Sequence, residues 1–196
     1  MSKISFVNTI VPKGQYKDRE KVGDVYLIHF DPTEKEGMNA YECVECSVPV
    51  SDYNGSEVLD AYEAWKEKHD AAELAYAIRS KVAEIEAYDT SSNVNGFVLN
   101  GMTVWLDKAT RVGLMNSTTI AKAAGQQTTT LWLGDVKLEV DCDKAIQLLS
   151  ALEMYALECF NVTAAHKAAV AELKTIKEVE AFDVTADYPQ QLVMKL

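Results

Sequence analysis

The feature that most constrains the fold is an apolar periodicity of three and four residues, which persists through two long stretches of the chain. The first stretch runs from Glu57 to about Tyr88, and Ser56 is its expected N-cap. The second begins at Asp141 or Asp143, either of which suits a helix cap, and continues to Ile176, about ten turns. The apolar positions of the second stretch are Ile146, Leu149, Leu152, Ala156, Cys159, Thr163, His166, Val170, Leu173 and Ile176. A helix of that length has to lie along a partner helix or protrude, so we predict two long helices.

The segment between the two helices predicts a β-hairpin over residues 96–106. Asn100 and Gly101 stand between two short β-prone runs, and both residue types tolerate the positive φ that a two-residue type I′ turn requires. A second hairpin is expected from Thr128–Leu133 and Val136–Val140, with its turn at Gly134-Asp135.

A short helix is expected between the two hairpins, over Leu114–Ala124. Asn116 or Ser117 suits its N-cap, and Gly125 is expected to end it. The tail from Phe182 to Leu196 contains Pro189 and little periodicity, so it is either a docked extension or loose.

The first fifty residues predict a small β module of three strands, over 4–11, 22–30 and 41–50. Turn-forming residues between Pro49 and Gly55 indicate a boundary. The expected fold class is therefore α+β: an N-terminal β module over residues 1–52, followed over 53–196 by two long helices bracketing two short β-hairpins and a short helix.

The composition excludes several classes of function. A net charge of -11 and a pI near 4.7 disfavour binding to nucleic acid or to anionic lipid, because the acidic groups repel phosphate. The N-terminal sequence lacks a secretion signal, and no apolar segment is long enough to insert into a membrane. Four cysteines without such a signal fit a reducing compartment better than a disulfide framework. We therefore expect a protein made in the cytoplasm.

Cys43 and Cys46 form the one motif with chemical character, since two thiolates at this spacing can share a zinc ion or form a redox pair. The remaining cysteines, Cys142 and Cys159, are about a hundred residues away and do not complete a four-ligand site. The alternative is that both are small, partly buried apolar residues. No other catalytic motif stands out, so we expect no enzyme activity and no cofactor.

His69 and His166 each fall inside the apolar stripe of a predicted long helix. If those helices pack antiparallel, the two side chains meet in a polar layer that sets the helix register. The alternative is two histidines that are satisfied separately at the edge of the seam.

Trp105 and Trp132 lie one in each predicted hairpin. They are candidates for a platform that binds a partner, and the alternative is that both pack against the helices.

The order of elements resembles an uncharacterised domain family of bacteriophages and prophages, found in tail-fibre-associated and tail-fibre assembly proteins. The resemblance covers about residues 70–180. It departs from the family pattern at Gly134-Asp135, which replaces an Asp-Asn-like turn. The matching positions are Gly96, Phe97, Gly101, Asp107, Arg111, Trp132, Leu173, Lys174 and Ile176.

This resemblance implies a phage tail role without a cofactor. The expected function is a structural or adaptor protein of the baseplate or tail fibre, made in the host cytoplasm and incorporated in the virion tail. A tail-fibre assembly chaperone is the first alternative, and a small thiol- or metal-dependent enzyme is the second. The expected partners are other tail or fibre proteins, together with a further copy of this chain through the long C-terminal helix.

Overall fold

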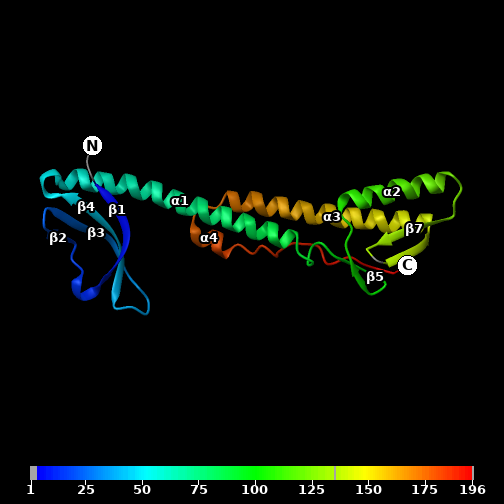
Figure 1. The fold of residues 1–196 in the computed structure, drawn as a ribbon, viewed down its shortest axis with the longest axis horizontal. Coiled ribbons are helices and arrows are strands. Elements are labelled where there is room, and N and C mark those ends of the chain that lie inside the picture. Colours follow the sequence, from blue (N-terminus) through cyan, green and yellow to red (C-terminus); the bar gives the residue numbers. More distant parts are fainter. Residues whose placement is uncertain (1–3, 135, 196) are drawn as a thin grey trace. The chain divides into compact units, whose positions relative to one another are not determined.

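The computed structural model describes residues 4–134 and 136–195, and its mixture of helices and strands confirms the α+β class (Figure 1). The chain divides into two compact units. Unit 1 ends at Glu73 and unit 2 begins at Leu74. This division lies inside the first long helix, whereas the predicted boundary between residues 52 and 53 lies just before that helix, which begins at Gly55.

Unit 1 contains a four-stranded antiparallel sheet with the order β1-β4-β3-β2. The strands are β1 (Ser5–Pro12), β2 (Arg19–Val22), β3 (Val25–Glu34) and β4 (Ala40–Pro49). Two 3-10 turns, Lys13–Gln15 and Val50–Asp52, flank the sheet strands. The three predicted strands correspond to β1, β3 and β4, and the short edge strand β2 was missed because it buries little apolar surface.

The first part of helix α1 (Gly55–Asp89) covers one face of this sheet. Cys46, Val48 and Val58 form its buried centre. Around them aromatic rings pack closely, with Phe30 stacked on Tyr62 at 4.0 Å between ring centroids. The expected cap Ser56 is wrong, because the Asn54 side-chain oxygen accepts a bond from the Ser56 backbone N–H at 3.2 Å.

Unit 2 contains the remainder of α1 and two separate small sheets. Strands β5 (Phe97–Leu99) and β6 (Met102–Val104) pair as the predicted first hairpin. The φ angles of Asn100 and Gly101 are +50° and +84°, so the predicted two-residue turn is confirmed. Gly96 precedes this hairpin at a close approach, where an added Cβ would lie 2.7 Å from the Ser92 carbonyl oxygen.

The second hairpin consists of β7 (Thr128–Leu133) and β8 (Val136–Asp141), which confirms its predicted strands. Gly134 has a φ angle of +64°, and its predicted turn partner Asp135 lies outside the described residues.

Helix α2 (Lys108–Ala123) begins six residues before its predicted start. Its cap is Asp107 in place of Asn116 or Ser117, because the Asp107 carboxylate accepts the Thr110 backbone N–H at 2.8 Å. The helix ends just before Gly125, as predicted.

Helix α3 (Cys142–Ala171) is capped by Asp141, one of the two predicted caps. Its predicted extension to Ile176 is wrong. The chain leaves the helix after Ala171, and Thr175 starts the short helix α4 (Ile176–Ala181) by a capping box with Glu178.

The C-terminal tail is a docked extension, which resolves the two alternatives left by the sequence. Strand β9 (Val193–Met194) pairs in parallel with β5, giving the order β6-β5-β9. The main core of unit 2 surrounds the buried face of α3 and the hairpins, and includes Phe97, Leu131, Leu149 and Leu152. A smaller cluster joins Ile85, Val170 and Val184.

Candidate functional site

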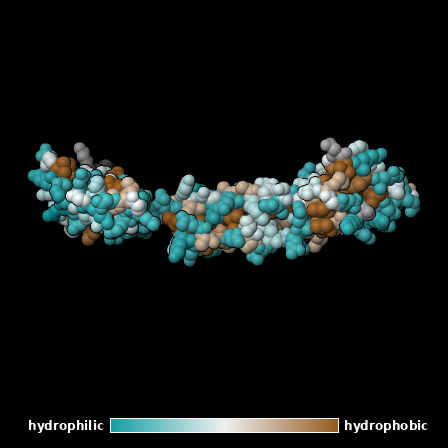
Figure 2. Space-filling model, turned by 90° about the horizontal axis from the view of Figure 1, so that it is seen from below, coloured by the Kyte–Doolittle hydropathy of each residue, from teal (hydrophilic) through white to brown (hydrophobic). Residues whose placement is uncertain are grey.

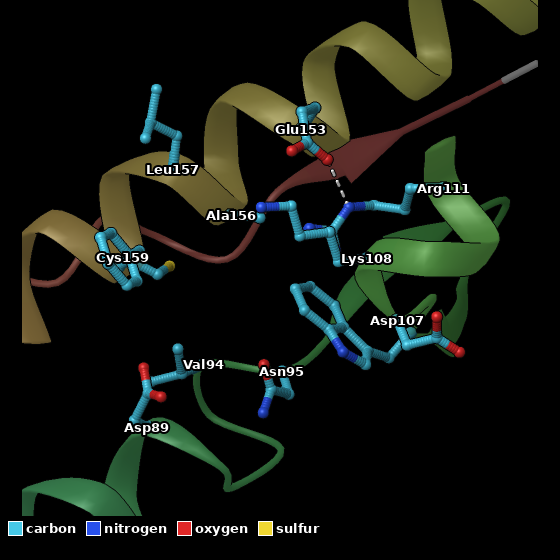
Figure 3. A pocket seen from close by; sticks show the side chains of 12 residues that line it. Asp89, Val94, Asn95, Asp107, Lys108, Arg111, Glu153, Ala156, Leu157 and Cys159 are labelled. Carbon is cyan, nitrogen blue, oxygen red and sulfur yellow. Dashed lines mark hydrogen bonds and ion pairs between the residues drawn. The ribbon is translucent and has the colours of Figure 1, made fainter. Parts of the chain in front are cut away.

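A cavity of about 450 Å³ opens in unit 2 among the end of α1, the segment before α2, and α3 (Figure 3). Its walls combine apolar and charged side chains from four separate stretches of sequence. The lining residues are Asp89, Val94, Asn95, Trp105, Asp107, Lys108, Arg111, Glu153, Ala156, Leu157, Cys159 and Phe160.

Arg111 is the best-fixed charged side chain of this cavity, with only 7% of the side chain exposed. Its Nε donates to the Glu153 carboxylate at 2.7 Å, as the dashed line in Figure 3 marks, and its Nη1 donates to the Leu106 carbonyl oxygen at 2.7 Å. The guanidinium also lies 5.3 Å from the centre of the Trp105 ring. These contacts hold the charge and the indole in one geometry, because the planar guanidinium forms directed bonds.

The carboxylates around the cavity have structural hydrogen bonds. Asp107 accepts the Thr110 backbone N–H and hydroxyl, and these bonds lower its pKa below the ordinary value. Asp89 accepts the Thr163 hydroxyl at 2.6 Å, and Glu153 is paired with Arg111. Each carboxylate is therefore held by a hydrogen bond or an ion pair within the fold.

Cys159 is the thiol on the cavity wall, and it is buried. Burial is the largest influence on the thiol and raises its pKa above the ordinary value. A thiol in this state is largely protonated at neutral pH, so it is a poor nucleophile.

A smaller cavity of about 150 Å³ shares Arg111 and Glu153 with the first one. Its other lining residues are Val112, Met115, Asn116 and Leu149. The ion pair therefore forms part of the lining of both hollows.

The structure does not bring Cys43 and Cys46 together as a metal or redox pair. They are three residues apart on β4, and successive strand residues point to opposite faces of a sheet, so the two thiols face opposite sides. Both are buried, and burial raises the pKa of each, that of Cys46 to about 11. In the described part of the chain, no group of three or more histidine, cysteine or acidic side chains is placed to hold a metal ion.

The two tryptophans have different environments. Trp105 packs partly buried against the core and forms an edge-on contact with Tyr155 at 6.5 Å, so it belongs to the cavity. Trp132 is 57% exposed on β7 and is not a lining residue. Trp105 therefore lines the cavity and Trp132 does not, and the platform formed by both residues stays a prediction.

His69 and His166 each have contacts within their own unit. His69 stacks on Trp65 at 4.6 Å in unit 1 and lies 3.4 Å from the Asn8 side chain. His166 in unit 2 is buried and forms T-shaped ring contacts with Phe182 and Tyr188. His166 Nδ1 has no hydrogen-bond partner among the described residues, so His166 is not a fully satisfied histidine, and the polar layer shared with His69 stays a prediction.

The residues at the cavity that sequence reasoning missed are mainly Glu153 and Phe160. Glu153 resembles any solvated acidic residue of an amphipathic helix, and its ion pair with Arg111 joins positions 42 residues apart. Phe160 was missed because it is not one of the periodic apolar positions of α3, and its side chain is 66% exposed. Arg111 and Asp107 had a signal, since both are positions of the family resemblance.

None of the helices in the described parts of the chain combines the length and the apolar character needed to cross a membrane.

Comparison with known proteins gives one match. No curated protein and no solved structure matches the chain. A family model described as "Domain of unknown function (DUF4376)" matches residues 76–186, which is more than half of the sequence and includes every residue that lines the cavity. The chain therefore belongs to this family of unknown function.

Proposed function

We propose that this protein is a non-enzymatic structural or adaptor protein of a bacteriophage tail, associated with the baseplate or the tail fibre. It is made in the host cytoplasm and becomes part of the virion tail. The tail assignment rests on the resemblance of residues 70–180 to phage tail-associated domains, and the adaptor assignment rests on the cavity of unit 2.

The observation that carries the adaptor role is the bonding of the cavity's charged groups. Asp107 caps a helix, Asp89 binds Thr163, and Glu153 pairs with Arg111. A catalytic site instead needs an acid, base or nucleophile with a perturbed pKa aimed at a substrate. Fixed polar groups beside exposed apolar walls are typical of a surface that receives a side chain of a partner.

The apolar part of this surface is accessible to a protein partner. Leu157 is 48% exposed and Phe160 is 66% exposed, and Trp105 lines the same cavity. A hollow of about 450 Å³ is large enough for one or two side chains of a partner segment.

The first alternative is a tail-fibre assembly chaperone, which would use the same surface and leave before the virion is complete. The second alternative is a thiol- or metal-dependent enzyme. The positions of Cys43 and Cys46 on opposite sheet faces weigh against that alternative.

Mass spectrometry of purified virions distinguishes the first two functions. We expect the protein in mature particles. Its absence from particles, together with its presence on unassembled fibres, would favour the chaperone, and absence from both would overturn the tail role.

Variants of the cavity test the binding surface in the same particles. Trp105→Ala and Phe160→Ala should lower incorporation into virions, whereas Trp132→Ala changes an exposed tryptophan outside the cavity and should not. Phe160→Ala should leave the fold intact, because the ring is mostly exposed, so a loss of incorporation in this variant reports on binding and not on misfolding. Normal incorporation of both cavity variants would contradict the cavity as the docking site.

A further inference from the structure

The outer face of α3 loses almost all charge over its second half. From Met154 to Ala171 a single charged residue, Glu158, is among the exposed described positions. The other exposed positions are Met154, Leu157, Phe160, Asn161, Ala164, Ala165, Ala168, Ala169 and Ala171. Figure 2 shows hydrophobic side chains reaching the surface of unit 2 on the face it draws.

The exposed positions of α1 in unit 1 and of the first part of α3 are mostly charged or polar, although α1 and α2 also expose the apolar residues Leu59, Tyr76, Val112 and Ile120. The exposed positions of α1 in unit 1 include Glu57, Asp60, Glu63, Glu67, Lys68, Asp70 and Glu73. Within α3 itself, the exposed positions before Met154 are Asp143, Lys144, Gln147 and Ser150. The second half of α3 therefore differs from the first part of the same helix in exposing almost no charge, as expected of a contact surface.

Six of the exposed residues have the spacing of a coiled-coil seam. Steps of three and four residues separate them, which places them at positions a and d of successive heptads. We call these six residues the outer seam: Met154, Leu157, Asn161, Ala164, Ala168 and Ala171. The opposite side of the helix carries Leu152, Cys159 and His166, which are buried in unit 2.

We propose that the outer seam binds the outer seam of a second copy of this chain, with the two α3 helices parallel. Asn161 favours this occupant, because it takes an a position in the middle of the seam. In a parallel pair each Asn161 amide meets the other, and an amide both donates and accepts hydrogen bonds. In an antiparallel pair, position a faces position d, so the amide would lie opposite the methyl group of Ala164.

One of the three pairs that flank the seam joins opposite charges in the parallel arrangement. The residue that flanks the seam at position g faces a residue five positions later in the other copy. Lys167 then faces Glu172 of the second copy, and the side chain of Lys167 is 38% exposed beside its partner Glu86. Phe160 faces the small Ala165 in the same way.

The remaining flanking pair joins two acidic residues, Glu153 and Glu158 of the second copy. Their repulsion is reduced because Glu153 is already paired with Arg111 at 2.7 Å. The chain as a whole carries a net charge of -11, so contact through a nearly uncharged helix surface also reduces the repulsion between copies.

Alanine at three of the six seam positions limits the apolar area of each layer, so we expect association in the micromolar range. This pairing does not depend on the tail role. A protein that is found in virions but stays monomeric would contradict the pairing and leave the tail role intact. A protein that dimerises but is absent from virions would do the reverse.

Sedimentation equilibrium of the full chain, over micromolar to hundred-micromolar concentrations, tests the proposal. We expect a monomer–dimer equilibrium. The double variant Met154→Glu/Ala164→Glu should shift it to the monomer, with a dissociation constant at least about tenfold larger than that of the wild type. Neither residue lines the cavity, whose lining shares only Leu157 with the outer seam. Asn161→Leu should tighten association and admit other oligomers, because the polar residue that fixes the register is lost.

The matched control is Ile120→Glu combined with Ala169→Glu. It adds the same two charges at exposed positions outside the outer seam, one on α2 and one on α3. This variant should dimerise like the wild type, and circular dichroism should show the same helix content in both. A wild-type chain that is monomeric at every concentration overturns the proposal, as does an equal loss of dimer in the control.

Disulfide trapping tests the orientation. Met154→Cys and Ala171→Cys, each alone, should give covalent dimers on mild oxidation, because identical layers meet in a parallel pair. Cross-linking only in a mixture of the two variants would show an antiparallel pair and overturn the parallel arrangement.

Discussion

Asp31 is the residue whose backbone and side chain together secure β3 to α1 in unit 1. Its φ angle is +50°, next to the irregularity between Phe30 and Thr33. Its carboxylate accepts the Tyr62 hydroxyl at 2.8 Å and pairs with Lys66. The bond from Lys66 is the largest of the influences that lower the pKa of Asp31, followed by the bond from Tyr62.

Asp31→Ala should reduce the free energy of unfolding by about 1–2 kcal/mol, because Tyr62 loses its acceptor and alanine disfavours a positive φ. Asp31→Asn should cost less, since asparagine accepts the same hydrogen bond and tolerates this backbone conformation. Urea unfolding of the two variants measures the difference. An equal loss in both would assign the effect to the negative charge alone.

The thiols of Cys43, Cys46 and Cys159 should be unreactive in the native chain. Burial is the largest cause of the raised pKa of each one, so few thiolates exist at pH 8. Labelling with a chromogenic disulfide should be slower by on the order of 100-fold in buffer than in urea, because it requires opening of the fold. Rapid labelling of Cys43 or Cys46, or stoichiometric zinc in the purified protein, would revive the enzyme alternative.

At the scale of residues, sequence reasoning identified the right kinds of residue without their neighbours. Cys43 and Cys46 form a recognisable spacing, but in a strand that spacing separates the side chains to opposite faces. Trp105 was a candidate, and its ion-paired neighbours Arg111 and Glu153 come together only through the packing of α2 on α3. Contacts between distant positions carry no periodic signal, so the cavity could not be predicted.

At the scale of elements, the apolar periodicity predicted which helices and strands exist better than it predicted where each one begins and ends. Both long helices and both hairpins are present, because their patterns extend over many residues. The predicted ends failed where a cap competed with the pattern. Leu173 and Ile176 continue the apolar spacing of α3, yet Thr175 and Glu178 form a capping box that starts a new helix.

That capping box gives α4 a pH dependence. Hydrogen bonds from the Thr175 hydroxyl, followed by backbone N–H groups, lower the pKa of Glu178 below its ordinary value of 4.5. Because the pKa is lower in the folded chain, the stabilisation is fully present when the pH is above the pKa of Glu178 in the unfolded chain. It is lost as the pH falls through the pKa of Glu178 in the folded chain. We expect amide protection of residues 176–181 to fall below about pH 4.5, where it should follow the titration of Glu178.

Glu178→Gln provides the control for this titration. Glutamine can accept the same bonds but does not titrate, so the pH-dependent part of the protection should disappear. Protection factors from hydrogen exchange at several pH values measure the effect. An identical acid transition in the variant would assign it to another carboxyl, such as Asp183, whose pKa is also lowered, chiefly by the Thr185 hydroxyl.

At the scale of the whole molecule, the two units have separate apolar cores. The core of unit 1 is centred on Cys46, Val48 and Val58. The main core of unit 2 includes Leu149 and Leu152, and all of its members follow the division within α1. The family match likewise begins at residue 76, inside unit 2, so the conserved family model and the physical unit share nearly the same N-terminal limit.

Separate cores predict that damage in one unit is local. Leu149 is 1% exposed, so Leu149→Ala should destabilise unit 2 by about 2–5 kcal/mol through lost burial and a residual cavity. Val48 is fully buried, and Val48→Ala should destabilise unit 1 by about 2 kcal/mol for the same reason. Hydrogen exchange with mass spectrometry should show faster exchange only within the unit that carries the substitution. If Leu149→Ala accelerated exchange equally in β1 to β4, the continuous helix α1 would have to transmit unfolding between the units, and the chain would unfold as one cooperative body.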